Sequence, residues 1–259
     1  MINYIRSEFY RILHYKWTYL FIIICSALLL SSNIVLAAVK YSDSRFPYAT
    51  TDFSLANALT SMGMIYLLCI TVSSMIFNHE YRNQTLKNCV SYGYSRATIF
   101  FGKLLVQIVY SMIVFVIILG SFILSAYLLL ENSGSSSIYQ LVRACFACLP
   151  LFISGLAITN CFLFMIEGSG AASAAALSVM FALPMVCNML AMRFDIFAKI
   201  YKVLAWSIVN SPSYRFSTGL AITYWDTQQR FINCWIIGIT TTVLISMVGF
   251  LAFRKKDIK

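Results

Sequence analysis

Charged residues are absent from six long stretches of this chain, and the segments between them carry the Asp, Glu, Lys and Arg residues. Each stretch is mostly apolar and 23 to 27 residues long: Trp17–Val39, Phe53–Asn78, Leu104–Leu130, Ala144–Ile166, Gly168–Met192 and Phe231–Phe253. A helix needs about 20 apolar residues to cross the hydrocarbon core of a bilayer. The pattern therefore predicts an all-α polytopic membrane protein with six transmembrane helices, at about residues 17–39, 56–77, 104–130, 144–166, 170–191 and 231–253.

These stretches allow two other interpretations. The first stretch could be a cleaved signal peptide, since Ala37 and Ala38 follow it, but it exceeds the roughly 7–15 residues of a signal core. The fourth and fifth stretches could form one span, but a helix of 49 residues is too long for hydrocarbon about 30 Å thick. Glu167, Gly168 and Gly170 supply a break between them. An uncleaved first helix and six spans are therefore favoured.

The composition supports the same class. The chain is 60% hydrophobic and 11% charged, with a mean hydropathy of +0.80, whereas soluble domains carry about 25% charged residues. These values exclude a soluble enzyme, a disordered regulator and a disulfide-stapled secreted domain. Most of the eight cysteines lie inside apolar stretches, and Cys145 and Cys148 lack a second pair of ligands, so helix packing is favoured over a metal or redox site.

The formal net charge is +10, and its distribution indicates membrane topology rather than nucleic-acid binding. With six spans, both termini share a side that carries 11 Lys and Arg residues, against three in the short loops of the other side, Lys40, Arg45 and Arg143. The long segment 193–230 is left out because long loops cross with less regard for charge. We therefore expect a plasma-membrane protein with cytoplasmic N- and C-termini, in contact with membrane lipid and not with nucleic acid.

Residues 1–16 are expected to form an amphipathic helix in the membrane interface. Its apolar side chains share one stripe and are Ile2, Ile5, Phe9, Ile12 and Leu13. The polar side chains, Glu8 and Arg11 among them, face away from that stripe and are expected to lie among lipid headgroups. The helix either anchors the chain before the first span or acts as a lateral elbow that couples the cytoplasmic face to the bundle.

Two segments between spans are long enough to hold structure of their own. Residues 78–103 carry several charges and read as a cytoplasmic helical hairpin, broken at Gly93 and suited to docking on a soluble partner. Between spans five and six, Val203–Tyr214 and Phe216–Trp225 are apolar but too short to cross. They are expected to form short re-entrant or interfacial helices, with a folded cap over the bundle as the alternative.

Polar and small residues within the spans predict helix contacts. Four amide side chains lie in spans, where bonding between helices is commoner than lining a substrate route: Asn57, Gln107, Asn160 and Asn188. Gly170, Ala174 and Ser178 repeat every four residues and are expected to let another helix approach closely. No ionisable residue is expected deep in any span, which disfavours a proton- or ion-coupled carrier.

Catalytic and nucleotide-binding motifs are missing from the sequence. The one Gly-Lys pair, Gly102 and Lys103, lacks the upstream Gly and the following hydroxyl of a P-loop. His79 and Glu80 begin like a zinc-protease helix, but position 83 is Asn, so the second ligand is absent. The chain is therefore expected not to be an enzyme and to hold no metal or cofactor of its own.

Three pieces of the sequence resemble the permease subunits of ABC exporters of the type-2 permease family. They are the basic amphipathic start with Glu8 and Arg11, the segment from Phe77 to Lys103, and the tail Phe253–Ile258. The middle piece contains FNHEYRNQTLK and then Tyr-Ser-Arg, and it is similar to the family's segment after span two. One departure is Gln84, where a glycine commonly precedes the Thr-Leu-Lys.

The resemblance implies that residues 1–259 form a single permease domain, which is half of a transmembrane unit. The other half would be a second copy or a sister permease, and a cytoplasmic ABC ATPase dimer would bind the ATP. The family's coupling segment corresponds here to residues 78–103. The residues expected to face the ATPase are Glu80, Tyr81, Thr85, Leu86, Lys87 and Arg96. The alternative is that these charges only solvate a loop.

The resemblance also suggests a function. Small permeases of this layout are similar to those that confer immunity to lantibiotic or bacitracin-like peptides, so we expect export of an amphipathic cargo from the membrane, giving antibiotic resistance or bacteriocin immunity. An ATP-independent membrane channel, receptor subunit or scaffold is the alternative from another class. The sequence does not indicate which residues bind the cargo.

Overall fold

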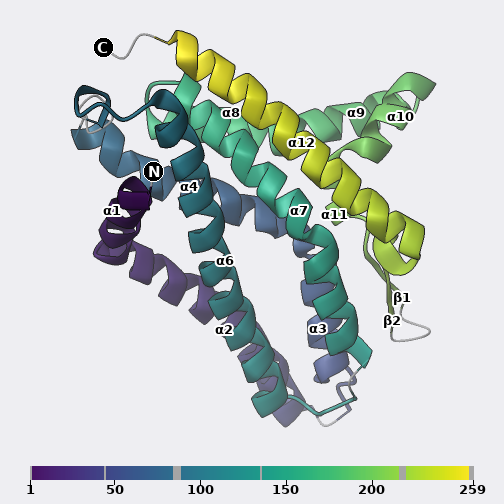
Figure 1. Ribbon diagram of the computed structural model, residues 1–259. Helices are drawn as coiled ribbons and strands as arrows, with labels where there is room; N and C mark the ends of the chain where they lie inside the picture. The colour runs from purple at the N-terminus through teal and green to yellow at the C-terminus, as the bar shows by residue number, and fades with distance from the viewer. Residues whose placement is uncertain (1, 44, 84–88, 135, 216–219, 257–259) are drawn as a thin grey trace.

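A computed structural model describes residues 2–43, 45–83, 89–134, 136–215 and 220–256 of the chain. Five of its helical segments are long and apolar enough to cross a membrane, namely α2 (Lys16–Ser42), α6 (Arg96–Leu129), α7 (Ser136–Met165), the segment Ser169–Ala191, and α12 (Gln228–Lys255). The segment Ser169–Ala191 consists of α8 (Ser169–Leu177), a π-helical turn η2 (Ser178–Ala182) and α9 (Leu183–Ala191). With the bent pair described next, the bundle has six spans, which confirms the all-α polytopic fold (Figure 1).

The second span is broken near its middle, whereas the sequence predicted one span over 56–77. Helix α3 (Thr51–Thr60) ends before Ser61, a 3₁₀ turn η1 (Met62–Met64) follows, and α4 (Ile65–Asn83) continues at an angle of 51°. The bend makes room for α11 (Ala205–Val209), because a Cβ at Gly63 would lie 2.9 Å from Oδ1 of Asn210 and 3.3 Å from the ring of Trp206. Glycine at the turn thus permits a close packing that hydrophobicity alone does not reveal.

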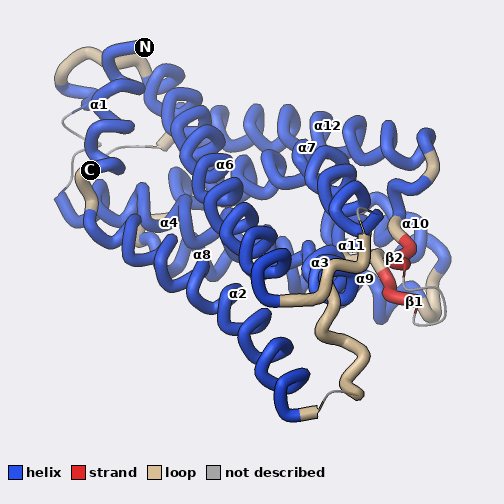
Figure 2. The backbone as a smooth tube through the Cα atoms, turned by 90° about the horizontal axis from the view of Figure 1, so that it is seen from below, coloured by secondary structure: helices blue, strands red, loops and turns tan. Residues whose placement is uncertain are grey.

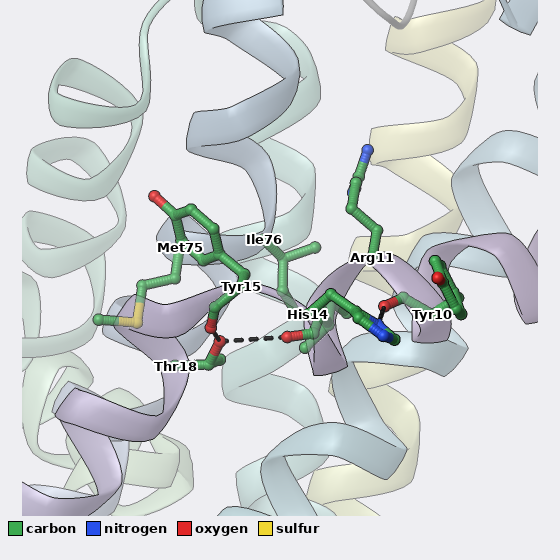
Figure 3. A pocket seen from close by; sticks show the side chains of 8 residues that line it. Tyr10, Arg11, His14, Tyr15, Thr18, Met75 and Ile76 are labelled. Carbon is green, nitrogen blue, oxygen red and sulfur yellow. Dashed lines mark hydrogen bonds between the residues drawn. The ribbon is translucent and has the colours of Figure 1, made fainter.

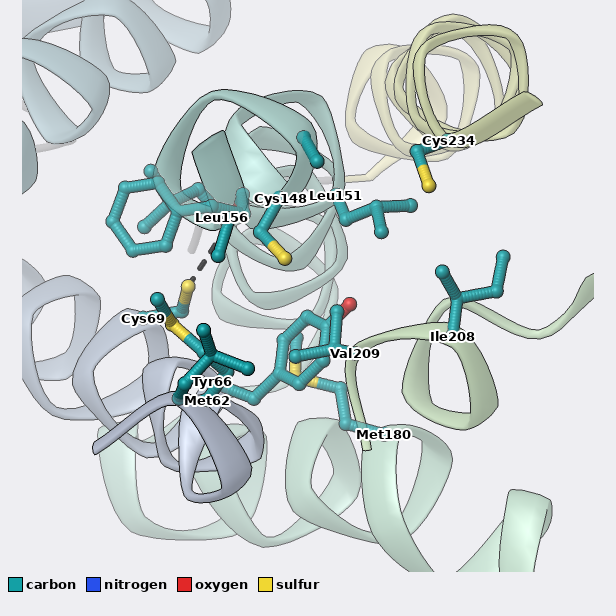
Figure 4. Close-up of a cluster of buried hydrophobic side chains, with 14 of the residues drawn as sticks. Met62, Tyr66, Cys69, Cys148, Leu151, Leu156, Met180, Ile208, Val209 and Cys234 are labelled. Carbon is teal, nitrogen blue, oxygen red and sulfur yellow. Dashed lines mark hydrogen bonds between the residues drawn. The ribbon is translucent and has the colours of Figure 1, made fainter. Parts of the chain in front are cut away.

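Helix α7 forms the centre of the bundle, and α12 packs along it (Figure 1). Their contact is close because α12 has glycines there: a Cβ at Gly238 would lie 2.5 Å from the carbonyl carbon of Pro150. Around α7, buried side chains from α4, η2, α11 and α12 form the larger apolar cluster (Figure 4).

The small residues of the fifth span do not make such a contact. Gly170, Ala174 and Ser178 are exposed, and within the described residues nothing lies within 4 Å of a Cβ built at Gly170. The expectation of a close helix approach along this stripe is therefore wrong within the chain, since the buried small residues of α8 are Ala172 and Ala176 on another face.

The two ends of the bundle differ in what they contain. Helix α1 (Ile2–Leu13), the end of α4, the start of α6 and the described end of α12 lie at one end, called here the N/C end (Figures 1 and 2). The loops after α2 and α6 lie at the other end, called here the far end. There the N–H of Thr51 donates to the carbonyl oxygen of Glu131 at 2.9 Å, and Lys40 pairs with the Glu131 carboxylate at 2.5 Å.

The segment between spans five and six is only partly helical. It contains α10 (Asp195–Val203), α11, an antiparallel hairpin of β1 (Ser213–Arg215) and β2 (Leu220–Ile222), and a 3₁₀ turn η3 (Tyr224–Asp226). The short helices agree with the prediction, but Phe216–Trp225 is not a re-entrant helix, since its described part holds β2 and η3. Thr223 and Asp226 cap η3 reciprocally, and Arg143 of α7 donates to the carbonyl oxygens of Trp225 and Asp226 at 3.2 and 2.9 Å.

Candidate functional site

Three of the residues predicted to face an ATPase are described, and they lie at the N/C end. Glu80 and Tyr81 fall at the C-terminal end of α4, and Arg96 is the first residue of α6. Thr85, Leu86 and Lys87 lie outside the described residues. The helices reach into the predicted loop 78–103 from both sides, since α4 continues to Asn83 and α6 begins at Arg96.

The start of α6 is defined by its own sequence. Gly93 has a φ of +83°, a left-handed conformation that glycine adopts without strain. Its N–H donates to the carbonyl oxygen of Val90 at 3.0 Å, so the chain turns there. Ser95 then caps α6, its hydroxyl accepting from the N–H of Thr98 at 3.2 Å. These bonds place Arg96 in the first turn of α6.

Arg96 is bonded to the end of the last span. Its guanidinium Nη1 lies 2.9, 2.7 and 2.7 Å from the carbonyl oxygens of Phe253, Arg254 and Lys256. The last carbonyls of a helix have no partner within it, and positive charge near them is favourable. Arg96 therefore joins the beginning of α6 to the end of α12, whatever further contact it makes with a partner protein.

A second cationic side chain makes a similar contact nearby. Lys256 Nζ lies 3.3 Å from the carbonyl oxygen of Phe164 and 3.2 Å from that of Met165, at the end of α7. The three helices α6, α7 and α12 are thus connected at the N/C end by two basic side chains that satisfy helix ends. Between them, the rings of Phe164 and Phe253 pack with centroids 4.5 Å apart.

A buried ion pair joins α1 to α6. Lys103 is fully buried, and its Nζ lies 3.2 Å from Oε2 of Glu8, which is 4% exposed. Arg11 Nη2 lies 2.5 Å from the same carboxylate oxygen, and the ring of Phe77 lies 4.6 Å from Lys103 Nζ. A buried charge is tolerated when it is paired and hydrogen-bonded. This cluster, Glu8 with Arg11 and Lys103, is called the elbow ion cluster below.

The cluster corrects two expectations from the sequence. Glu8 does not face lipid headgroups, because the buried side of α1 is formed by Tyr4, Glu8 and Ile12, while Ile2 of the predicted apolar stripe is 81% exposed. Lys103 does not lie in an aqueous loop, because it is in the second turn of α6 and buried. The sequence pattern does not predict this pair, because each charged residue is flanked by an apolar neighbour and the two partners are 95 positions apart in the chain.

The turn from α1 to α2 is also fixed by polar contacts. The hydroxyl of Thr18 donates to the carbonyl oxygens of Ile12, at 3.1 Å, and of Tyr15. A cavity of about 310 Å³ lies beside this turn, between it and Met75 of α4 (Figure 3). The helix α1 is therefore held against the bundle at both its middle and its end.

Amide side chains connect the spans at greater depth. Gln107 Nε2 donates to Oδ1 of Asn160 at 3.0 Å, and Ser73 donates to Oε1 of Gln107 at 3.3 Å, which joins α4, α6 and α7. This confirms bonding between helices for Gln107 and Asn160. A second group was not singled out from the sequence: Asn33 of α2 donates to Ser125 at 2.7 Å and accepts from Ser54 at 2.6 Å.

The described residues show no constellation for catalysis. Within them, no three His, Cys, Asp or Glu side chains lie close enough to hold a metal ion. All eight cysteines are free thiols, and Cys148 of the CxxC pair is buried against the apolar cluster of α7. The side chains at the N/C end connect helices to one another.

The spans and the joined helix ends define a multi-pass membrane protein. Comparison with known families then identifies the chain more closely, because residues 4–184 match the family described as ABC-2 family transporter protein. The matched region covers more than half of the chain, so the protein belongs to this family. It is the membrane-spanning permease component of an ABC transporter, a kind of component that works with a separate ATPase. Comparison with curated proteins gives no matching relative.

Proposed function

We propose that this permease exports an amphipathic cargo from the membrane and that an ABC ATPase dimer drives it by moving the segment that joins α4 to α6. A second copy of the chain or a sister permease completes the unit. The termini lie in the cytoplasm, which places the N/C end beside the ATPase. The immunity or resistance role follows if the cargo is an antimicrobial peptide.

One observation supports this coupling more than any other: Arg96, the first residue after the segment, is bonded to the end of α12. A displacement of the segment would move the start of α6 and with it the end of the last span. Lys103, two turns further along α6, would carry the same displacement to α1 through Glu8. A force applied at the α4–α6 segment would therefore move α6, the end of α12 and α1 together.

The ATPase contact is assigned to the predicted residues Glu80, Tyr81, Thr85, Leu86, Lys87 and Arg96. Charged side chains in such a contact fix register and partner choice more than they add affinity. Glu80 and Arg96 supply opposite charges at the two sides of the segment.

Co-purification tests the ATPase contact. The tagged permease is co-expressed with candidate ABC ATPases, and the ATPase recovered per permease is measured. We expect the double variant Glu80→Ala/Tyr81→Ala to lower recovery at least tenfold. The matched control is Glu131→Ala, which removes a carboxylate at the far end. If the double variant and Glu131→Ala recover the same amount of ATPase, Glu80 and Tyr81 do not form the ATPase contact.

Labelling in intact cells tests the orientation. Tyr92 is 84% exposed and lies at the N/C end. Tyr41 is 95% exposed and lies near the C-terminus of α2, at the far end. Each is changed to Cys, and labelling by a membrane-impermeant maleimide is compared with the parent chain. We expect Tyr41→Cys to react in intact cells and Tyr92→Cys to react only after permeabilisation. The reverse result places the N/C end outside and contradicts the proposal.

The alternative functions predict other results. An ATP-independent channel, receptor subunit or scaffold would recruit no ATPase with either form of the chain. Such a protein would also retain its activity when Arg96 is changed to Ala, because nothing would drive the start of α6.

A further inference from the structure

A cavity of about 290 Å³ lies beside the break in the second span, between α2, α3, α4 and α6. Its mouth is formed by exposed side chains of α2 and of the bent pair, including Leu29, Asn57 and Met64. Its floor is apolar and buried, with Met62, Ile118 and Phe122. This is called the break cavity below.

The break cavity lies at mid-depth of the spans. Leu29 is at the centre of α2, which runs from Lys16 to Ser42. Asn57 lies in the second half of α3 and Ser61 directly follows that helix. Helix α3 starts at the far end and has 10 residues, so at 1.5 Å per residue it is about 15 Å long. Half of a hydrocarbon core is also about 15 Å. The mouth therefore opens at the depth of lipid chains, away from both ends.

Two polar side chains at the mouth, those of Asn57 and Ser61, have no hydrogen-bond partner within the described residues, whereas the hydroxyl of Ser32 donates to the carbonyl oxygen of Leu29 at 2.7 Å. The Asn57 carboxamide makes no hydrogen bond there, and neither does the Ser61 hydroxyl, although the backbone oxygen of Asn57 accepts from Ser61 N at 3.1 Å. A carboxamide in hydrocarbon without a partner is unfavourable, because lipid chains offer no hydrogen bonds. A molecule that fills the cavity and bonds to Asn57 would remove this cost.

The lining also limits what can bind. None of the residues that line the break cavity carries a charge, and most are Leu, Ile, Met, Phe or Ala. A charged group would enter without a counter-ion, so the bound part of the ligand is neutral. A dry apolar cavity of about 150 Å³ holds a molecule the size of benzene, so the break cavity accepts one or two rings or a branched aliphatic group.

We propose that the break cavity binds the uncharged, apolar part of a membrane-soluble amphiphile, with Asn57 as the hydrogen-bonding partner of a neutral amide or hydroxyl on that molecule. The proposal rests on the proposed export function, because it identifies the class of cargo and its place of entry from the lipid. The charged part of the amphiphile stays outside the cavity.

Photolabelling of the full-length permease in nanodiscs, without ATPase, tests the site. The probe is an uncharged phenyl diazirine that bears a primary amide, and labelled peptides are mapped by mass spectrometry. We expect labelling of Phe115, which lines the cavity, to exceed labelling of Val116, which is 65% exposed on the next position of α6, by at least fivefold.

Two variants and a matched control make the result specific. Ala58→Trp fills the cavity and should reduce labelling of Phe115 to the level of Val116, whereas Val116→Trp places the same ring outside the cavity and should leave it unchanged. Asn57→Leu keeps the volume but removes the carboxamide. We expect it to lower labelling by the amide probe about tenfold and labelling by the same diazirine without the amide less than twofold.

Three outcomes would overturn the proposal. The first is labelling of Phe115 no greater than that of Val116. The second is equal competition by a probe that carries a carboxylate in place of the amide. The third is rapid disulfide formation between two chains carrying Met64→Cys, because a second copy would then cover the mouth. Because photolabelling is done without an ATPase, its result does not depend on the proposed ATPase contact. That contact is tested separately by co-purification.

Discussion

The N/C end and the far end hold their helices together by different means. At the N/C end, buried or half-buried cations cross between helices to a carboxylate or to helix-end carbonyl oxygens, as Lys103, Arg96 and Lys256 do. At the far end, short backbone contacts join the loops, and Lys40 pairs with Glu131, whose side chain is 64% exposed. A buried pair depends on both partners, whereas an exposed pair is screened by water. The N/C end should therefore be the less tolerant of substitution.

The largest effect is expected from Glu8→Gln. Lys103 is fully buried and would lose its carboxylate, and breaking a buried pair typically costs about 3–5 kcal/mol. Lys103→Met should cost less, because Arg11 remains to pair with Glu8. Thermal unfolding of the purified permease measures both. If Glu8→Gln unfolds at the wild-type temperature, the elbow ion cluster does not stabilise α1.

A second comparison uses an arginine at each end. Arg96→Ala removes a charged group from the carbonyl oxygens of α12, and Arg143→Ala removes one from Trp225 and Asp226 at the other end. Each should lower stability by about 1.5–3 kcal/mol, since hydrogen bonds to charged groups are worth that much.

The function of the two arginine variants should differ even where their stability does not. We expect Arg96→Ala to lower cargo transport by the assembled transporter at least tenfold and Arg143→Ala to lower it less than threefold. Transport is measured in vesicles at equal amounts of folded protein. Equal loss in both would mean that the link from α6 to α12 has no special part in coupling.

The smallest effect is expected from Lys40→Ala. Its partner Glu131 is exposed, and such pairs are worth about 0.2–1 kcal/mol. The unfolding temperature of the variant should be only slightly below that of the wild type, and this small difference should disappear at high salt, which screens the pair. A loss as large as that of Glu8→Gln would show that the two ends do not differ in the way proposed.

The hydrophobic pattern predicted the spans because bilayer thickness imposes a minimum length on each apolar stretch. It did not predict the break at Ser61, because the bend depends on Gly63 meeting Trp206 and Asn210, far away in sequence. It misplaced Glu8 and Lys103 for a related reason, since the burial of a charge depends on a partner that periodicity cannot identify.

The predicted ATPase-facing residues came from a resemblance rather than from physical pattern. The family match supports the class of protein, and the geometry adds the contacts of Arg96 with the end of α12. A signal for those contacts was present in the sequence as basic residues flanking two spans. The sequence does not show which basic residue contacts which helix end, because the acceptors are backbone carbonyl oxygens, which every residue type has.

The break at Ser61 also affects how movement passes through the bundle. Helix α3 is hydrogen-bonded to the far-end loops, and α4 ends at the N/C end. A displacement along α4 would therefore change the 51° angle between the two helices. Helix α6 runs without interruption over 34 residues beside it. Of these two neighbours, α6 is one continuous helix and the α3–α4 pair is bent, so a displacement applied at the N/C end would reach the far end along α6, whereas the bent pair would absorb it at Ser61.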